Sequence, residues 1–190
     1  MRNVIASEMV SLDGYFAGPN GEIDWFVWNK DSEKYAIELA NSVDTILFGR
    51  VTYEMMANYW PSASPPTDNA VIIDKMNSLP KIVFSRTLER PEWNNTRLIK
   101  ENIAEEISRM KKQPGKDMVI YGSGRIVSFL LNHDLIDEMH LLVNPVVLGS
   151  GKPLFTNIAY RHKMSLVGTS SFGSGVVALH YSRMSEGTEL

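Results

Sequence analysis

Short apolar stretches of strand length alternate with stretches of helical periodicity through the first two-thirds of the chain, and this alternation limits the possible folds most strongly. Strands are predicted over residues 4–10, 45–48, 81–84, 96–100 and 117–121. Helices are predicted between them, over residues 31–43, 53–60, 68–79, 101–112 and 125–132. Strand–helix–strand units of this kind build parallel sheets with right-handed crossovers.

The C-terminal third has a different pattern, because three strands are predicted there without a long helix between them. These strands cover residues 138–148, 162–169 and 175–182. We therefore predict an α/β fold: a mixed, mostly parallel central sheet with helices on both faces and an antiparallel C-terminal hairpin. A chain of 190 residues is typical of one domain, which we place over residues 1–184, followed by a polar tail at 185–190.

The composition excludes several classes of protein. The chain has no cysteine, which rules out disulfides, thiolate metal sites and a cysteine nucleophile. The four histidines show no metal-ligand spacing, so no metal is expected. The net charge of −3 and the lack of a basic stripe argue against nucleic acid as a partner. Neither a signal peptide nor a membrane span is predicted, and we expect a cytoplasmic protein.

Three predicted strands end in the same way, with small or hydroxyl residues followed by an arginine. Their ends are Gly49-Arg50, Ser85-Arg86 and Gly122-Ser123-Gly124-Arg125. Ligands of open parallel sheets bind outside the carboxyl ends of the strands, where helix N-termini and arginine side chains suit phosphate groups. Taken alone, each signal is equally compatible with a tight turn or a surface charge. Together, the three ends predict a site for a nucleotide.

Several motifs resemble the dihydrofolate reductase superfamily, in the branch that includes the C-terminal reductase domain of bifunctional riboflavin-biosynthesis enzymes. The resemblance covers residues 4 to about 155 and is carried by residues 11–17 (SLDGYFA), 46–54 (ILFGRVTYE), 83–88 (VFSRTL), 120–125 (IYGSGR), 135–138 (LIDE) and 145–151 (PVVLGSG).

This resemblance implies an enzyme, an NADPH-dependent oxidoreductase. It places the cofactor against the first strand, the three strand ends and the helix start that follows the last of them. The implied cofactor-binding residues are Ala6, Gly49, Arg50, Thr52, Ser85, Arg86, Gly122, Ser123, Gly124, Arg125 and Ile126. Arginine side chains at such a site favour NADPH over NADH, because only NADPH carries the 2′-phosphate.

Catalytic and substrate-binding residues are also implied by the resemblance. Glu33, in the first turn of the first helix, is the candidate proton donor; a solvated first-turn charge is the alternative. Asp13 follows the first strand and is the second catalytic candidate, or simply part of a turn. Residues 18–30 form the expected flap over the site. Trp25 in that flap and Tyr53 are the candidate substrate-binding residues.

Two positions depart from the riboflavin-pathway pattern. Ser7 stands where those reductases usually carry a lysine, and Tyr121 stands where they usually carry a glutamate. We therefore expect reduction of a C=N or C=C bond in a small pterin-like or pyrimidine-like heterocycle. A riboflavin-pathway pyrimidine reductase and a catalytically silent nucleotide-binding module are the alternatives. By the same resemblance, we expect a homodimer.

Overall fold

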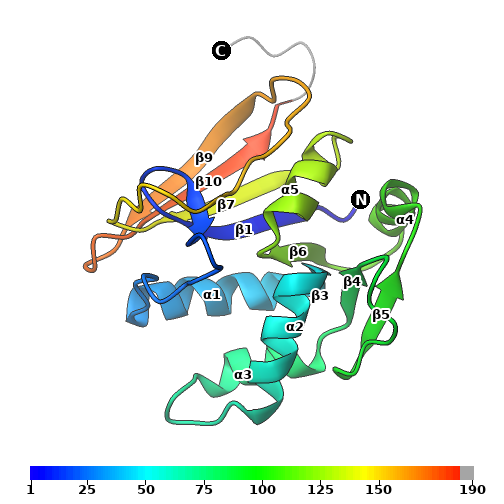
Figure 1. Ribbon diagram of the computed structural model, residues 1–190, viewed down its shortest axis with the longest axis horizontal. Helices are drawn as coiled ribbons and strands as arrows, with labels where there is room; N and C mark the ends of the chain where they lie inside the picture. Colours follow the sequence, from blue (N-terminus) through cyan, green and yellow to red (C-terminus); the bar gives the residue numbers. More distant parts are fainter. Residues whose placement is uncertain (185–190) are drawn as a thin grey trace.

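The computed structural model describes residues 1–184 and shows one eight-stranded sheet in the order β5-β4-β3-β6-β1-β7-β10-β9 (Figure 1). The first six strands in this order run parallel, whereas β10 is antiparallel to β7 and to β9. The strands of this sheet are β1 (Val4–Val10), β3 (Val43–Gly49), β4 (Lys81–Phe84), β5 (Thr96–Ile99), β6 (Asp117–Tyr121), β7 (Glu138–Val143), β9 (Met164–Ser171) and β10 (Val177–Arg183).

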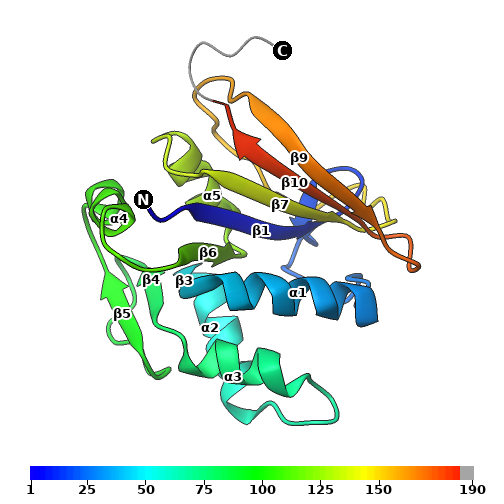
Figure 2. The ribbon, with the colours of Figure 1, turned by 180° about the vertical axis from the view of Figure 1, so that it is seen from behind.

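Within residues 1–184, five α-helices cover the two faces of the sheet (Figure 2). They are α1 (Lys30–Ser42), α2 (Arg50–Tyr59), α3 (Ala70–Ser78), α4 (Ile103–Lys111) and α5 (Gly124–Leu131), and a short 3-10 helix (Trp60–Ser62) follows α2. Apolar residues of α1, α2 and α3 pack on one face, and those of α4 and α5 pack on the other. The fold is therefore the α/β architecture predicted from the sequence, with its antiparallel C-terminal strands.

Alternation along β1 shows how the sheet separates two cores. Val4 and Val10 belong to the core under α4 and α5, whereas Ile5 belongs to the core under α1, α2 and α3. Successive side chains of a strand point to opposite faces, and here both faces are covered by helices. This is why β1 has a mostly apolar sequence, which only Ser7 and Glu8 interrupt.

The structure contains two short strands that the periodicity did not predict, β2 (Tyr15–Ala17) and β8 (Lys152–Pro153), which pair with each other. The strand predicted over residues 138–148 is also shorter, because β7 ends at Val143. Asn144 interrupts it: its backbone N–H donates to Val10 O and its side-chain carbonyl accepts from Val27 N–H. The predicted tail, residues 185–190, lies outside the described residues.

No helix within residues 1–184 has both the length and the apolar composition that a bilayer span requires.

Candidate active site

The three arginine-containing strand ends lie at one edge of the sheet, as the sequence predicted. β3 pairs in parallel with both β4 and β6, with Gly49 opposite Phe84 and Leu47 opposite Ile120. Parallel pairing in this register brings the carboxyl ends of β4, β3 and β6 side by side. We call this side of the sheet, formed by the carboxyl ends of the strands, the rim. Ligands of open α/β sheets bind there.

Two glycine-containing junctions approach each other closely at the rim. A Cβ atom at Gly49 would lie 2.0 Å from the hydroxyl oxygen of Ser123, and a Cβ atom at Gly122 would lie 2.8 Å from the methyl carbon of Thr52. Gly124 is just as restricted, because a Cβ atom there would lie 2.9 Å from the carbonyl oxygen of Leu154. Only glycine fits at these three positions, and the β3–α2 and β6–α5 junctions form one continuous cradle.

Both helices that start at the cradle leave their first backbone N–H groups available. α1 and α3 are preceded by the N-cap residues Asn29 and Asn69, whose side chains accept N–H groups of the first turn. In the described chain, α2 and α5 have no such side-chain cap, and neither does α4. Gly122 and Ser123 both have positive φ values, 68° and 77°, at the start of α5. Uncapped N–H groups at a helix start, together with the positive end of the helix dipole, favour a bound anion.

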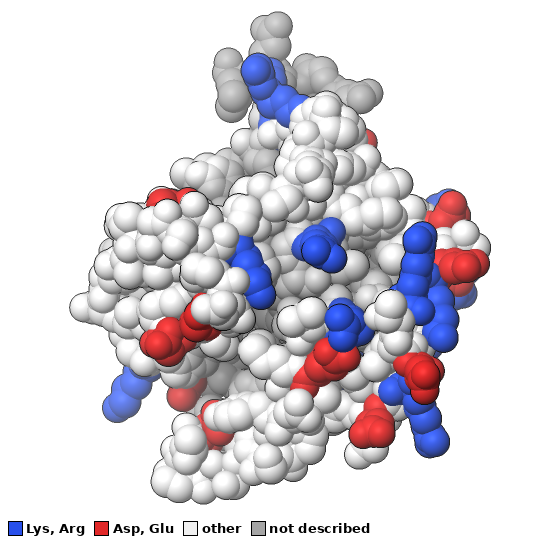
Figure 3. Space-filling view, viewed as in Figure 1, with Lys and Arg blue, Asp and Glu red and all other residues white. Residues whose placement is uncertain are grey.

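The arginines predicted to bind phosphate are exposed near this cradle. Arg50 forms a 3.1 Å ion pair with Glu54, one turn further along α2. Arg86, after β4, and Arg125, in the first turn of α5, are exposed. Figure 3 shows Lys and Arg side chains across the face that carries α2 and α5. Glycines that permit close approach, free N–H groups and cationic side chains together fit the phosphates of a dinucleotide.

Three other predicted cofactor residues have different surroundings. The Ser85 hydroxyl oxygen accepts the backbone N–H groups of Thr87 and Leu88, at 3.1 and 2.9 Å, and so shapes the turn after β4. Ile126 is half-buried against the core under α5. Ala6 is fully buried in the middle of β1, so its side chain lies in the core and not at the rim.

Asp13 holds a loop. Its carboxylate accepts hydrogen bonds from the Ser11 hydroxyl at 2.7 Å and from the backbone N–H groups of Leu148 and Gly149 at 3.1 and 2.8 Å. The Ser11 hydroxyl and these amides lower the pKa of Asp13. A carboxylate stabilised in its charged form is a poor proton donor at neutral pH. This position suits a structural role for Asp13 better than a catalytic one.

The other predicted catalytic and substrate residues are dispersed. Glu33 is half-buried on α1, and its Oε1 accepts a hydrogen bond from the Asn69 side chain at 3.0 Å. Trp25 packs edge-on against Phe26, and its indole N–H donates to Glu22 O. Tyr53 is 3% exposed, and its hydroxyl oxygen accepts the backbone N–H of Trp93. Because Tyr53 lies in the core, we leave it out of the proposed site.

Glu8 is a candidate functional residue that the sequence analysis missed. It is 3% exposed, and its Oε1 has no hydrogen-bond partner among residues 1–184. Burial raises the pKa of Glu8 well above its ordinary value, and the neighbouring backbone N–H of Gly122 opposes this only in part. A carboxyl whose protonated form is favoured by burial therefore lies beside the cradle. The available signal was a charged residue inside a mostly apolar strand.

The two departures from the riboflavin-pathway pattern are neighbours in the sheet. Ser7 on β1 lies opposite Tyr121 on β6, at the last register pair before the rim. Tyr121 packs partly against the core under α1, α2 and α3, and burial raises the pKa of its hydroxyl, which stays neutral. Both positions of this pair therefore carry an uncharged side chain in this chain.

A mostly parallel eight-stranded sheet, with the cradle after β3 and β6, defines a dihydrofolate reductase-like domain. Consistently, dihydrofolate reductase from Enterococcus faecalis in complex with NADP(H) shares the fold with a TM-score of 0.63 at 16% identity, over 95% of this chain and 96% of that one. A protein of Shewanella sp. PV-4 provisionally assigned to riboflavin biosynthesis has a TM-score of 0.78 at 24% identity, over 97% and 100% of the two chains.

The family follows from the sequence comparisons. The family model described as "RibD C-terminal domain" matches residues 2–178. The Bacillus subtilis (strain 168) protein YyaP is 38% identical over 180 residues, which cover 95% of this chain and 94% of YyaP. The chain therefore belongs to the RibD C-terminal domain family, in agreement with the resemblance found in its motifs.

Proposed function

We propose that this protein is an NADPH-dependent reductase that transfers a hydride to a C=N or C=C bond of a small pterin-like or pyrimidine-like heterocycle. The observation that carries the proposal is the cradle at the rim, where Gly49 and Gly122 allow two helix starts to meet with uncapped N–H groups. Membership of a reductase-domain family and a shared fold with dihydrofolate reductase support the same activity.

The residues at the cradle fit the phosphates of NADPH, which when bound would supply the hydride. The N–H groups at the starts of α2 and α5 would hold the pyrophosphate, with Arg50 and Arg125 nearby. Arg86, at the end of the neighbouring strand, would bind the 2′-phosphate. Thr52 packs against Gly122 and fixes the distance between the two junctions.

Proton delivery would come from a carboxyl that keeps its proton at neutral pH. Of the acidic residues considered, Glu8 has the environment that this task needs, because burial raises its pKa. Glu33, the candidate from the resemblance, is the second choice. Asp13 is third, because the bonds that hold the 145–151 loop also lower its pKa.

The substrate class follows from the neutral pair Ser7 and Tyr121. Without a lysine and a glutamate at these positions, the site has fewer charged groups that could pair with an ionic substituent of the substrate. This favours a heterocycle without a charged substituent. The riboflavin-pathway precursor is thus the alternative substrate. The other alternative is a protein that binds the nucleotide but has lost catalysis, since Ser7 and Tyr121 lie opposite each other beside the rim.

A direct experiment separates these possibilities. Purified protein is titrated with NADPH by calorimetry, and NADPH oxidation is then followed at its absorption band with dihydropterins, dihydrofolate and an aminopyrimidine panel. Binding and oxidation with a neutral heterocycle support the proposal. Binding without oxidation of any member would favour the silent module, and no binding of NADPH would refute the cofactor site.

The homodimer remains part of this proposal. β9 forms one edge of the sheet and exposes Leu166 and Val167, each 56% exposed. Exposed apolar residues on an edge strand favour pairing with a second chain. Light scattering on the purified protein measures the mass directly, and a monomer at micromolar concentration would contradict this expectation.

A further inference from the structure

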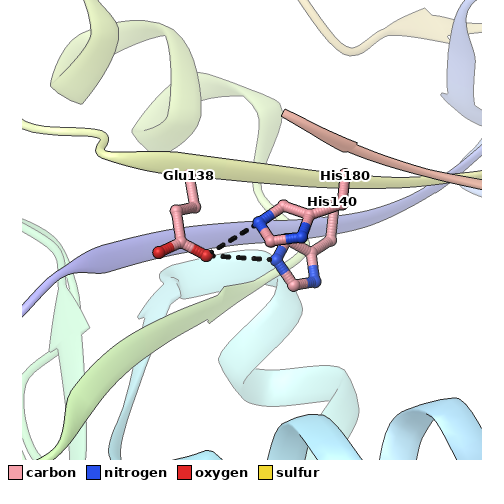
Figure 4. Close-up of side chains that lie close together, drawn as sticks. All are labelled: Glu138, His140 and His180. Carbon is pink, nitrogen blue, oxygen red and sulfur yellow. Dashed lines mark hydrogen bonds and ion pairs between the residues drawn. The ribbon is translucent and has the colours of Figure 1, made fainter. Parts of the chain in front are cut away.

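Three metal-ligating side chains converge on the face of the sheet that α1 covers. Glu138 and His140 lie two residues apart on β7, and His180 lies opposite His140 on the antiparallel strand β10. Figure 4 shows both imidazole rings turned toward the same carboxylate oxygen. Glu138 Oε2 is 2.9 Å from His180 Nε2 and 3.4 Å from His140 Nε2.

These distances match the first coordination shell of a single ion. When an ion lies about 2.1 Å from its nitrogen and oxygen ligands, neighbouring ligand atoms are about 3.0 Å apart at right angles and about 3.4 Å apart in a tetrahedron. One ligand atom from each of the three residues lies within 4.8 Å of the others. Small side-chain rotations would therefore bring all three onto one ion.

The side chains behind the cluster hold two of the ligands in position. The Asn3 amide donates to Glu138 Oε1 at 3.0 Å, which leaves Oε2 for the cluster. The Tyr35 hydroxyl is 2.8 Å from His140 Nδ1. If this nitrogen carries the ring proton, the Nε2 lone pair points at the shared site. Such partners of the outer shell are typical of metal-binding histidines.

A cavity gives access to the cluster. It has a volume of about 330 Å³, and both His140 and His180 line it, together with residues of α1 and β9 such as Ser42 and Thr169. The three ligand side chains are 11–30% exposed, so an ion could enter without unfolding of the sheet. The remaining coordination positions would face this cavity and would take water or a small ligand.

We propose that Glu138, His140 and His180 form an open binding site for a divalent transition-metal ion, with Zn²⁺ as the first candidate. Two imidazoles and one carboxylate suit zinc, iron, cobalt or nickel and are a poor set for magnesium or calcium, which prefer oxygen ligands. The site is separate from the rim, because Glu138 begins β7 whereas the rim lies at the carboxyl ends of the parallel strands. It therefore does not depend on the proposed reductase activity.

The competing explanation is an ion pair between Glu138 and a protonated histidine. A single ion pair would account for one histidine at Glu138, whereas the Nε2 atoms of both His140 and His180 lie within 3.4 Å of the same carboxylate oxygen. The sequence analysis expected no metal, since the four histidines show no ligand spacing along the chain. Strand pairing supplies the spacing that the sequence lacks.

The test uses untagged full-length protein that has been stripped with a chelator and is titrated with Zn²⁺ by calorimetry. We expect binding of one ion per chain, a rise in thermal midpoint on adding Zn²⁺, and a visible d–d absorption band with Co²⁺. His140→Ala and His180→Ala should each abolish these signals. Tyr35→Phe should weaken binding about tenfold, because it removes an outer-shell partner.

Matched controls make the result decisive. His133→Ala removes an exposed histidine on the other side of the sheet and should leave Zn²⁺ affinity unchanged. Should a ligand variant fail to fold, imidazole resonances of the wild-type protein provide the answer: Zn²⁺ should shift those of His140 and His180 and not those of His133. The proposal would be overturned if the wild-type protein bound Zn²⁺ no more tightly than a His140→Ala/His180→Ala variant. Unshifted His140 and His180 resonances would overturn it as well.

Discussion

Gly49 and Ser123 are packed so tightly that a methyl group on residue 49 would lie 2.0 Å from the Ser123 hydroxyl oxygen and 2.8 Å from its Cβ. The first contact could be relieved by rotation of the serine side chain, but the second could not. Because these residues belong to the junctions after β3 and before α5, their contact sets the width of the cradle.

Gly49→Ala should therefore destabilise the protein and weaken NADPH binding together. Overpacking of this kind costs about 1–3 kcal/mol, measured as the free energy of unfolding in urea. Ser123→Gly is the matched partner, because residue 123 has a φ of 77° that glycine adopts without strain. The double variant should recover most of the lost stability. If it does not, the contact between residues 49 and 123 is not the cause of the destabilisation.

Arg86→Ala tests the choice between the two nicotinamide cofactors. If Arg86 binds the 2′-phosphate, the variant should lose about tenfold in NADPH affinity and little in NADH affinity, as expected for one exposed charge-assisted contact. Calorimetry with both cofactors measures the ratio. Arg90→Ala, an exposed arginine four residues further on, serves as the control. Equal losses for NADPH and NADH would argue against this role.

Glu8→Gln should reduce turnover and change how stability depends on pH. The folded-state pKa of Glu8 is raised, so its carboxyl favours the folded state below the unfolded pKa, and this contribution is lost as pH rises through the folded pKa. The variant should lack that decline, as measured by unfolding at several pH values. If Glu8 donates the proton, turnover should also fall about 100-fold or more.

Glu33→Gln is the comparison for this experiment. Its carboxyl accepts a bond from Asn69, which the amide can retain through its own oxygen. Full activity in Glu8→Gln with a large loss in Glu33→Gln would reverse the order of the two candidate donors.

Asp13→Asn should loosen the loop at residues 145–151. The variant retains a carbonyl oxygen but loses one of the two carboxylate oxygens that accept Leu148 and Gly149 N–H groups. Hydrogen exchange at these two amides should become faster, while exchange in β1 stays unchanged. Since the pKa of Asp13 is lowered, the wild-type loop should be held above the unfolded pKa and released as pH falls through the folded pKa. Asp24→Asn, in the exposed flap, is the control.

Because of Lys81, the free energy of unfolding of the wild-type protein should rise with pH between about 8 and 10.5. The residue is 1% exposed, and burial lowers the pKa of Lys81 from 10.5 to about 8. Between these values the unfolded chain binds more protons, so stability should rise with pH across this window, by up to about 3 kcal/mol. The Asn77 and Leu79 carbonyls and the Trp93 ring stabilise the ammonium and reduce the gain.

Lys81→Met isolates this effect. The variant shares every other titrating group with the wild type, so the difference between the two unfolding free energies should change from pH 8 to pH 10.5 and stay constant from pH 6 to pH 7.5. A constant difference across the whole range would show that Lys81 keeps an ordinary pKa in the folded protein.

Local sequence signals identified most of the elements. The predicted strands over residues 4–10, 81–84 and 117–121 coincide with β1, β4 and β6, because apolar runs and their flanking turns are properties of neighbouring residues. The short pair β2 and β8 was missed, since two- and three-residue strands have no periodicity to detect. The alternation of strands and helices made the rim predictable, because it indicates parallel strands, which end at the same side of a sheet.

The sequence alone thus determined the fold class, the glycines and arginines at the three strand ends, and the family. Only the tertiary structure decided which side chains are buried and which meet across strands. It buried Tyr53, a candidate substrate-binding residue, in the core, placed the Glu8 carboxyl beside Gly122, and placed His180 opposite His140. Burial and register depend on residues far away along the chain, so no local pattern encodes them.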